Sequence, residues 1–237
     1  PGNNATIFQA MDQGKGDIDV HPDVWLPNQE SFTKKYVDGA GTVQLSQNAY
    51  QGDQGFCVSN NFAKANNITD IADLGRPDVA AKMDSDGNGR GEIWIGAPGW
   101  ASANVNQVKV RDYGLLDFVE PVRAEESVKT ARVKDSITKD EGYAFYCYKP
   151  HAVWYQFDVV MLSEPSFDPA KYQMIQPSDD ADWYEKSSVA TKDALKDVQI
   201  AFSKSLESRS PAIFEFFERF SLTADDVSSF AFEISGN

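Results

Sequence analysis

Residues 91–148, GEIWIGAPGWASANVNQVKVRDYGLLDFVEPVRAEESVKTARVKDSITKDEGYAFYCY, decide the fold. In this stretch, short runs rich in β-branched and aromatic residues alternate with longer segments of helical periodicity. The predicted elements are strands at 93–95, 116–121 and 143–148 and helices at 101–113 and 127–138. Strands that alternate with helices form a parallel sheet that the helices cover. The stretch therefore predicts an α/β fold.

The flanking segments are less regular. Before this stretch, the predicted elements are a helix at 5–11 and strands at 16–20, 42–45 and 55–58. In the last third, they are amphipathic helices at 194–206, 211–220 and 223–234. With 237 residues, the chain is long enough for two lobes.

Composition excludes two classes of protein. The chain carries 36 acidic and 22 basic side chains, so its formal net charge is −14. Nucleic-acid binding needs clustered Lys and Arg, so this acidic excess argues against a nucleic-acid partner. Charged residues also interrupt every apolar run before it reaches the roughly 20 residues that span a bilayer. The first residues show no signal-peptide pattern, which indicates a cytosolic or an already processed chain.

The segment DSDGNGRGE, residues 84–92, matches the front of a calcium-binding loop. Oxygen side chains occupy positions 1, 3 and 5, a glycine occupies position 6 and a carboxylate position 9. The predicted ligands are Asp84, Asp86, Asn88, Arg90 and Glu92. Position 12, where an EF-hand has Glu, is Ile95, and a strand follows instead of a helix. The loop therefore predicts an isolated structural Ca²⁺ site, and the alternative is a solvated acidic turn.

Three aromatic residues, Trp25, Trp100 and Tyr148, lie at the ends of predicted elements, where binding sites form. A single Trp is more often part of the core, but several rings arranged as a box favour a soft cation such as a quaternary ammonium. A helix is predicted directly after Trp100. The N–H groups of Ala101 and Ser102 in its first turn suit an anion such as a carboxylate. Together these groups predict a site for a small zwitterion.

Catalytic signatures are sparse. The chain has two histidines, His21 and His151, and no G-x-S-x-G, P-loop, G-x-G-x-x-G or H-E-x-x-H motif. Cys147 and His151 are four residues apart, so a thiolate–imidazole pair is the alternative that would make the protein an enzyme. Cys57 and Cys147 leave open a disulfide, two buried thiols, or one of each. We expect a protein that is not an enzyme.

Five segments together resemble one known family. They are ATIFQAM (5–11), GDIDVHPDVW (16–25), the loop 84–92, PGW (98–100) and YCYKP (146–150). They resemble the substrate-binding proteins of ABC importers for glycine betaine, proline betaine and related methylated osmolytes. The resemblance covers nearly the whole chain.

The resemblance implies a type II periplasmic-binding-protein fold, in which two α/β lobes are joined by a hinge and the ligand cleft lies between them. The expected boundaries are 1–57 and 163–237 for lobe 1 and 58–162 for lobe 2. Relatives begin with a strand, a helix and a second strand before the residue that matches Pro1. We therefore expect this part of lobe 1 to be missing from the chain.

The resemblance also implies roles for single residues. In the family an aromatic box holds the quaternary ammonium, and the matching positions are Trp25, Trp100 and Tyr148. Main-chain amides beside the second Trp hold the carboxylate, which corresponds to Ala101 and Ser102. Tyr148 stands where a Trp is common, which gives a weaker cation–π face and adds a hydroxyl.

Two further features concern the surroundings of this box. Cysteines that flank the second box Trp in some relatives are Gly96 and Ser102 here. His151, Trp154 and Trp183 are candidates for selecting among ligands, with packing or surface exposure as the alternative.

The resemblance implies a periplasmic protein, or one that is lipid-anchored outside the cytoplasmic membrane. It would capture an osmolyte for osmoprotection and deliver it to the permease and ATPase subunits of an ABC importer. Glycine betaine is favoured, and trimethylamine N-oxide, choline, carnitine and dimethylsulfoniopropionate are alternatives. We expect a monomer without an organic cofactor. A module that docks a protein partner through exposed aromatic residues is a third alternative.

Overall fold

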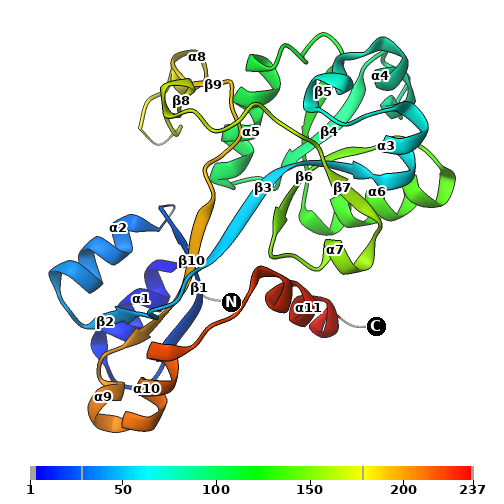
Figure 1. Ribbon diagram of the computed structural model, residues 1–237. Helices are drawn as coiled ribbons and strands as arrows, with labels where there is room; N and C mark the ends of the chain where they lie inside the picture. The colour runs from blue at the N-terminus through cyan, green and yellow to red at the C-terminus, as the bar shows by residue number, and fades with distance from the viewer. Residues whose placement is uncertain (1–3, 28, 178, 236–237) are drawn as a thin grey trace. The chain divides into compact units, whose positions relative to one another are not determined.

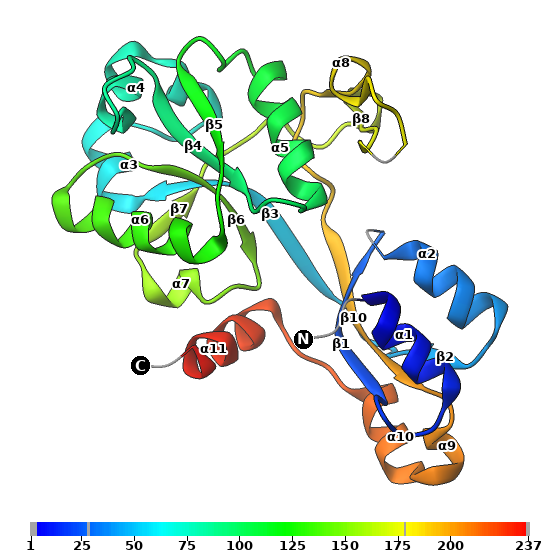
Figure 2. The same ribbon diagram turned by 180° about the vertical axis from the view of Figure 1, so that it is seen from behind.

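The computed structural model describes residues 4–27, 29–177 and 179–235. The chain forms two compact units (Figures 1 and 2). Unit 1 runs up to Asp53 and resumes with Leu195–Val227, and unit 2 consists of Gln54–Ala194 and the residues from Ser228 on. Residues 163–194, which the sequence assigned to lobe 1, are therefore part of unit 2.

Unit 1 is built around one long strand, β10 (Lys196–Ser203). Three other strands pair with β10 in antiparallel fashion: β1 (Val20–Leu26), β2 (Val43–Leu45) and the first residues of β3 (Tyr50–Ser59). The helices of this unit are α1 (Asn4–Gln13), α2 (Glu30–Thr33), the π-helix Lys34–Gly39, α9 (Leu206–Arg209) and α10 (Pro211–Arg219). Unit 1 is thus held together by the strand that comes last in its sequence.

The helix predicted at 194–206 is wrong, because these residues contain β10. At the start of β10, the buried Lys196, Val198 and Ile200 alternate with the exposed Asp197 and the half-buried Gln199. This period of two is the pattern of a strand. A segment this short fits both the period of 2 residues of a strand and the period of 3.6 residues of a helix. The strands that pair with it decide in favour of the strand.

The strand predicted at 16–20 lies further along the chain, because β1 begins only at Val20 and continues to Leu26. The pairing of β1 with β10 shifts its register between His21 and Val24, and Pro22 lies within this irregularity. β1 is at the end of the strand order, so Pro22 withholds no hydrogen bond from a second neighbour. The bulge therefore explains how a strand accommodates this proline.

The core of unit 1 forms around the fully buried side chain of Phe8 in α1. Its ring stacks with Phe32 and Tyr36 at centroid distances of 5.2 and 5.8 Å. Met11 and Val24 complete the same buried cluster. The apolar stripe of α1 thus packs on β1 and on the helical turns that follow it.

Unit 2 contains a sheet in the order β3-β6-β4-β5, with β7 on the other edge of β3. The new strands are β4 (Gly91–Gly96), β5 (Val119–Arg123), β6 (Ala144–Lys149) and β7 (Val159–Met161). β4 pairs in parallel with both β5 and β6, as the alternation of strands and helices predicts. The helices that flank the sheet are α3 (Asn60–Asn66), α4 (Pro77–Met83), α5 (Ala101–Asp112), α6 (Glu126–Lys139) and α7 (Val153–Gln156) (Figure 1).

A smaller segment of unit 2 follows β7. It contains a 3₁₀ turn (Pro169–Lys171), the short hairpin of β8 (Tyr172–Gln173) and β9 (Ser188–Val189), and between these strands α8 (Trp183–Lys186). Val189 and its neighbours pack against α5. The segment is thereby attached to the main body of unit 2.

Cys57 in β3 and Cys147 in β6 form a disulfide, which settles the alternatives that the sequence left open. Both side chains are buried in the large core of unit 2, among residues such as Phe56 and Trp94. The bond therefore cross-links neighbouring strands inside this unit.

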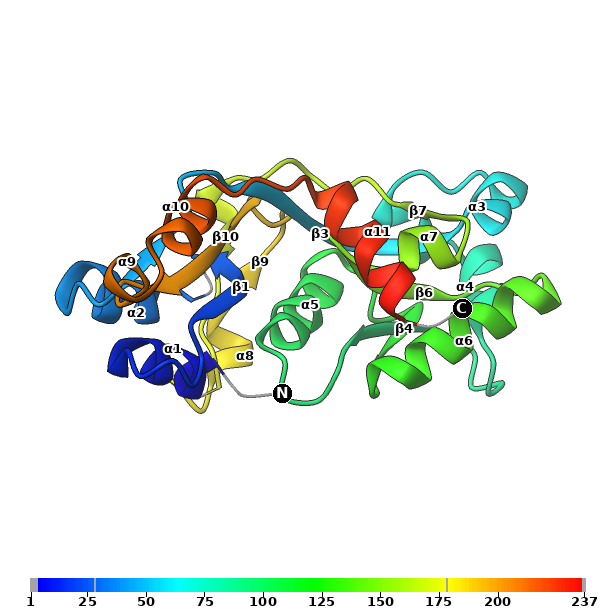
Figure 3. The ribbon, with the colours of Figure 1, turned by 90° about the horizontal axis from the view of Figure 1, so that it is seen from below.

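The last helix, α11 (Ala224–Ile234), belongs to unit 2 from Ser228 on. This part lies beside α7, where Phe232 stacks on Tyr155 at a centroid distance of 6.1 Å (Figure 3). Among the described residues, no helix is both long and apolar enough to cross a membrane.

Candidate ligand-binding site

The turn between β4 and α5 positions Trp100. Gly96 ends β4 with a φ of 134°, in the left-handed region that favours glycine. A Cβ on Gly96 would lie 2.9 Å from the Cβ of Ala103, so the glycine lets the start of α5 approach the strand. Trp100 is the N-cap residue, and Ala101 and Ser102 begin the helix. N–H groups in a first helical turn have no carbonyl partner within the helix and attract negative charge.

Four rings, which we call the aromatic group, gather where β4 and β6 end: Trp94, Trp100, Tyr146 and Tyr148. The ring of Trp100 lies 5.8 Å from that of Trp94 and 6.2 Å from that of Tyr148. β4 and β6 are parallel neighbours, so residues at their carboxyl ends meet at one edge of the sheet. Trp94 and Tyr146 are buried, whereas Trp100 and Tyr148 are half-buried. The accessible side of the group is therefore formed by Trp100 and Tyr148.

Glu126, the first residue of α6, lies beside the aromatic group and was not predicted as a site residue. Its Oε1 is 3.0 Å from Nε2 of His151 and accepts a hydrogen bond of 3.3 Å from the Tyr148 hydroxyl. Burial alone would raise the pKa of Glu126, but the hydrogen bond from His151 and the charge of Lys129 lower it to about 2. Glu126 is therefore an anion at neutral pH.

Lys129 supplies the positive partner of this anion. Its Nζ lies 3.4 Å from Oε1 of Glu126, and its side chain is 2% exposed. The ammonium also lies 5.4 Å from the ring centroid of Trp94, within the range of a cation–π contact. Burial lowers the pKa of Lys129, and Glu126 opposes this effect. The lysine is thus placed behind the aromatic group and away from solvent.

His151 and Trp154 adjoin Tyr148 from the loop and helix after β6. The His151 ring lies 4.8 Å from the Tyr148 ring, and its Nδ1 accepts the main-chain N–H of Val153 at 3.0 Å. Trp154 donates its indole N–H to the Tyr148 carbonyl at 2.8 Å. The main-chain N–H of His151 is bound by Ser228 of α11 at 3.1 Å. These contacts fix the loop that follows Tyr148.

Two predicted site residues lie outside this constellation. Trp183 in α8 is half-buried and packs in the cluster of Val105, Val108 and Val189. Trp25 is in unit 1, in β1 opposite Val198 of β10. The structure thus brings together Trp100, Ala101, Ser102, Tyr148, His151 and Trp154 in unit 2, while Trp183 packs elsewhere in that unit.

The enzyme alternative, a thiolate–imidazole pair of Cys147 and His151, is wrong because Cys147 has no free thiol. The sulfur of Cys147 is bonded to Cys57 and is buried, so it supplies no thiolate.

The loop at 84–92 folds around Asp84. The carboxylate of Asp84 accepts main-chain N–H groups from Gly87 at 2.7 Å and Gly89 at 2.8 Å. The hydrogen bond from Gly89 is the largest effect that lowers the pKa of Asp84. Asp86 accepts the N–H of Asn88 at 3.0 Å. The loop is therefore shaped by its own oxygen side chains.

The other two predicted ligands face different partners. Glu92 accepts a hydrogen bond of 2.7 Å from the Ser85 hydroxyl, and Arg90 forms an ion pair of 3.0 Å with Glu120. Within the described part of the chain, no three His, Cys, Asp or Glu side chains are grouped so that they could hold a metal ion. The fit to calcium thus rests on Asp84, Asp86 and Asn88.

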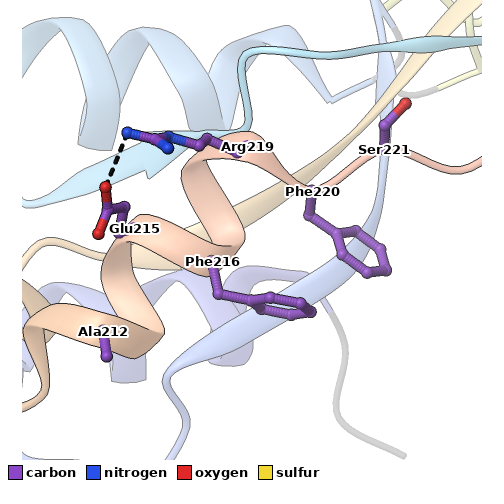
Figure 4. A pocket seen from close by; sticks show the side chains of 6 residues that line it. All are labelled: Ala212, Glu215, Phe216, Arg219, Phe220 and Ser221. Carbon is purple, nitrogen blue, oxygen red and sulfur yellow. Dashed lines mark ion pairs between the residues drawn. The ribbon is translucent and has the colours of Figure 1, made fainter.

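A separate groove of about 610 Å³ lies on α10 in unit 1 (Figure 4). Its lining residues are Ala212, Glu215, Phe216, Arg219, Phe220 and Ser221. Glu215 and Arg219 pair across one turn of the helix at 2.7 Å, and the side chains of Phe216 and Phe220 point away from this pair (Figure 4). The groove contains none of the predicted site residues.

A signal for Glu126 was present in the sequence. In an α/β fold, the helix after each parallel strand begins at the edge where ligands bind. Glu126 opens the helix after β5, just as Ala101 opens the helix after β4. Lys129 follows three residues later, on the same helical face. Trp94 and Tyr146 lie within strands, where a core role is the ordinary expectation.

The family model described as the substrate-binding domain of ABC-type glycine betaine transport systems, OpuAC, matches residues 1–237. A comparison with curated proteins gives no match. Among solved structures, the chain is similar to lactococcal OpuAC in a closed form with glycine betaine, with a TM-score of 0.61. The identity is 18%, over 99% of this chain and 76% of that one.

Two further structures are similar. The glycine betaine/L-proline-binding protein ProX from Borrelia burgdorferi has a TM-score of 0.59 and 19% identity, over 99% of this chain and 74% of that one. An ABC-transporter choline-binding protein in complex with choline has a TM-score of 0.56 and 16% identity, over 96% and 68%. At these identities the likeness concerns the fold, and it confirms the α/β binding-protein fold predicted from the sequence.

Proposed function

Since the chain belongs to the family of substrate-binding domains of ABC-type glycine betaine transport systems, whose members are transport proteins and not enzymes, we propose that it captures a small methylated osmolyte. It would hand this ligand to the permease and ATPase subunits of an ABC importer and act as a monomer. Glycine betaine is the favoured ligand. Choline, trimethylamine N-oxide, carnitine and dimethylsulfoniopropionate are alternatives that also carry a methylated cationic centre.

The observation that carries this proposal is the pair of half-buried rings, Trp100 before α5 and Tyr148 near the end of β6, whose centroids lie 6.2 Å apart. Ring faces attract a quaternary ammonium, which has no hydrogen bonds to donate and is weakly hydrated. The first-turn amides of Ala101 and Ser102 would receive the carboxylate of a zwitterion. Trp25 would contribute the third ring of the box, and His151, Trp154 and Trp183 are the proposed selecting residues.

The disulfide supports a location outside the cytoplasm. Structural disulfides persist in oxidising compartments and are rare in the cytosol. The buried bond between Cys57 and Cys147 therefore favours a periplasmic protein, or one anchored by lipid outside the cytoplasmic membrane.

A structural Ca²⁺ in the loop at 84–92 is also proposed. The spacing of Asp84, Asp86 and Asn88 supports it, together with the compact turn that these side chains form. The ion would stabilise the turn between α4 and β4 and would have no part in ligand capture.

Isothermal titration calorimetry with the five osmolytes tests the function. We expect micromolar affinity for at least one of them, which corresponds to about 8 kcal/mol of binding free energy. Trp100→Ala should abolish this binding while the circular dichroism spectrum is unchanged. Phe216→Ala, which truncates an aromatic side chain on α10 that is 54% exposed, is the control and should bind as the wild type does. Unchanged affinity of a folded Trp100→Ala variant would refute the box.

A further inference from the structure

The ion pair of Glu126 and Lys129 beside the aromatic group has one partly exposed and one buried partner. The Glu126 side chain is 34% exposed, whereas the Lys129 side chain is 2% exposed. Lys129 faces the buried rings of Trp94 and Phe145, at 5.4 and 5.9 Å from their centroids. The negative charge is therefore on the accessible side of the aromatic group and the positive charge is behind it.

His151 contacts the partly exposed partner of this ion pair. Its Nδ1 accepts the main-chain N–H of Val153, so this nitrogen carries no proton. Its Nε2, 3.0 Å from Oε1 of Glu126, then carries a proton and donates to the carboxylate. Glu126 thus keeps its full charge next to Tyr148, whose hydroxyl it also binds.

The negative charge of Glu126 acts differently on ligands that are net cations and on ligands that are zwitterions. A ligand with a net positive charge, such as choline, is attracted by the carboxylate through its whole charge. A zwitterion such as glycine betaine brings a carboxylate as well, and the repulsion of that group offsets part of the attraction. The buried Lys129 weakens both effects, because it compensates the same carboxylate.

We propose that Glu126 is a specificity-determining residue that sets how strongly the site prefers net cations over zwitterions. This inference rests on the proposed function. Glu126 acts through its negative charge, and the buried Lys129 partly compensates that charge.

The test is calorimetric titration of choline and glycine betaine into the wild type and into charge variants. Glu126→Gln keeps the shape and removes the charge, so the ratio of the choline Kd to the glycine betaine Kd should rise about tenfold. Lys129→Met keeps the aliphatic stem and removes the compensating charge, so the same ratio should fall. Glu125→Gln removes the charge of the exposed neighbouring carboxylate and is the matched control, with a ratio within twofold of the wild type.

A purely structural role would change both affinities by the same factor and leave the ratio constant in every variant. That result in folded Glu126→Gln protein, or opposite signs from those stated, overturns the inference. Glu126→Asp retains the charge and should restore the ratio toward that of the wild type, even if Lys129→Met does not fold. A wild type that binds neither ligand refutes the proposed function itself, whereas binding with an unchanged ratio refutes only the role of Glu126.

Discussion

Lys109 and Asp193 form an ion pair of 2.8 Å, and their side chains are 0% and 2% exposed. The same ammonium lies 2.8 Å from Oε2 of Glu164. Two tyrosines complete the network, since Tyr113 donates to Glu164 and Tyr172 donates to Asp193, each at 2.7 Å. Burial by itself lowers the pKa of Lys109, but the two carboxylates raise it above its ordinary value. The network attaches the segment after β7 to α5.

We expect Lys109→Met to lower the free energy of unfolding by about 3–5 kcal/mol, because it leaves two buried carboxylates without their cation. Urea denaturation followed by circular dichroism measures this change. Lys139→Met, which breaks an exposed pair with Asp135, is the control and should cost less than about 1 kcal/mol. Equal losses of unfolding free energy in the two variants would show that the buried network stabilises the protein no more than an exposed ion pair does.

The disulfide should contribute most of its stabilisation through the unfolded chain. Cys57 and Cys147 are 90 residues apart in the sequence, and closing a loop of that length corresponds to about 4–5 kcal/mol in the chain-entropy model. A Cys57→Ser, Cys147→Ser double variant should lose about this much stability against urea. The same denaturation of the wild type in excess reductant is the matched measurement. A loss in neither experiment would contradict the prediction.

The ionised Glu126 should make stability depend on acidic pH. Its folded pKa of about 2 is below the ordinary 4.5, so its contribution is fully present above pH 4.5 and is lost as the pH falls toward 2. We expect the stability difference between the wild type and Glu126→Gln to shrink across this window. Urea midpoints at pH 7, 4.5, 3.5 and 2.5 measure it. A difference that is constant with pH would exclude the ionised network.

Substitutions at two glycines near Trp100 distinguish the cost of backbone strain from the cost of a steric clash. Gly99 has a φ of 84°, and a Cβ there would meet no atom within 4 Å. Gly96 has a φ of 134°, and its Cβ would approach Ala103 to 2.9 Å. We expect Gly99→Ala to cost about 1–3 kcal/mol through strain, and Gly96→Ala to cost more. Thermal unfolding of both variants compares them, and a larger loss for Gly99→Ala would contradict this local geometry.

Calcium should stabilise the protein if the loop at 84–92 holds it. We expect the melting temperature to fall on addition of a chelator and to recover with excess Ca²⁺. Asp86→Ala should abolish the response, whereas Asp179→Ala, an acidic substitution elsewhere in unit 2, should retain it. An identical melting temperature with and without chelator would leave the loop as a turn without an ion.

The sequence predicted the α/β part of the fold well because two signals agreed there. Between 91 and 148, turn residues separate each strand from each helix, and the periodicity changes at the same points. In β10 the signals disagreed, since a short segment of mixed polar and apolar residues suits either a helix or a strand, and only its partners in β1, β2 and β3 select the strand. Tertiary pairing of this kind is not encoded locally.

The candidate site was predictable in part. Trp100 and Tyr148 were identified because they follow or end strands, and parallel pairing of those strands then brings them together. Glu126 was missed because an acidic residue in a first helical turn is ordinarily a favourable interaction with the helix dipole. The partners that Glu126 finds in Tyr148 and His151 come from β6 and the loop after it, and their proximity is not visible in the local sequence. The disulfide could not be inferred from two cysteines alone.

Unit 1 is divided between two distant segments of the chain, and this division determines which unit can fold first during synthesis on the ribosome. Residues 4–53 contain β1 and β2, but their common partner β10 is translated only after residue 195. The sheet of unit 2, by contrast, is complete once Met161 has emerged. Since domains generally fold as units during synthesis, we expect the second unit in the sequence to fold first. The nascent N-terminal segment, whose strands β1 and β2 still lack their common partner, must then wait for β10 until the last fifth of the chain is translated.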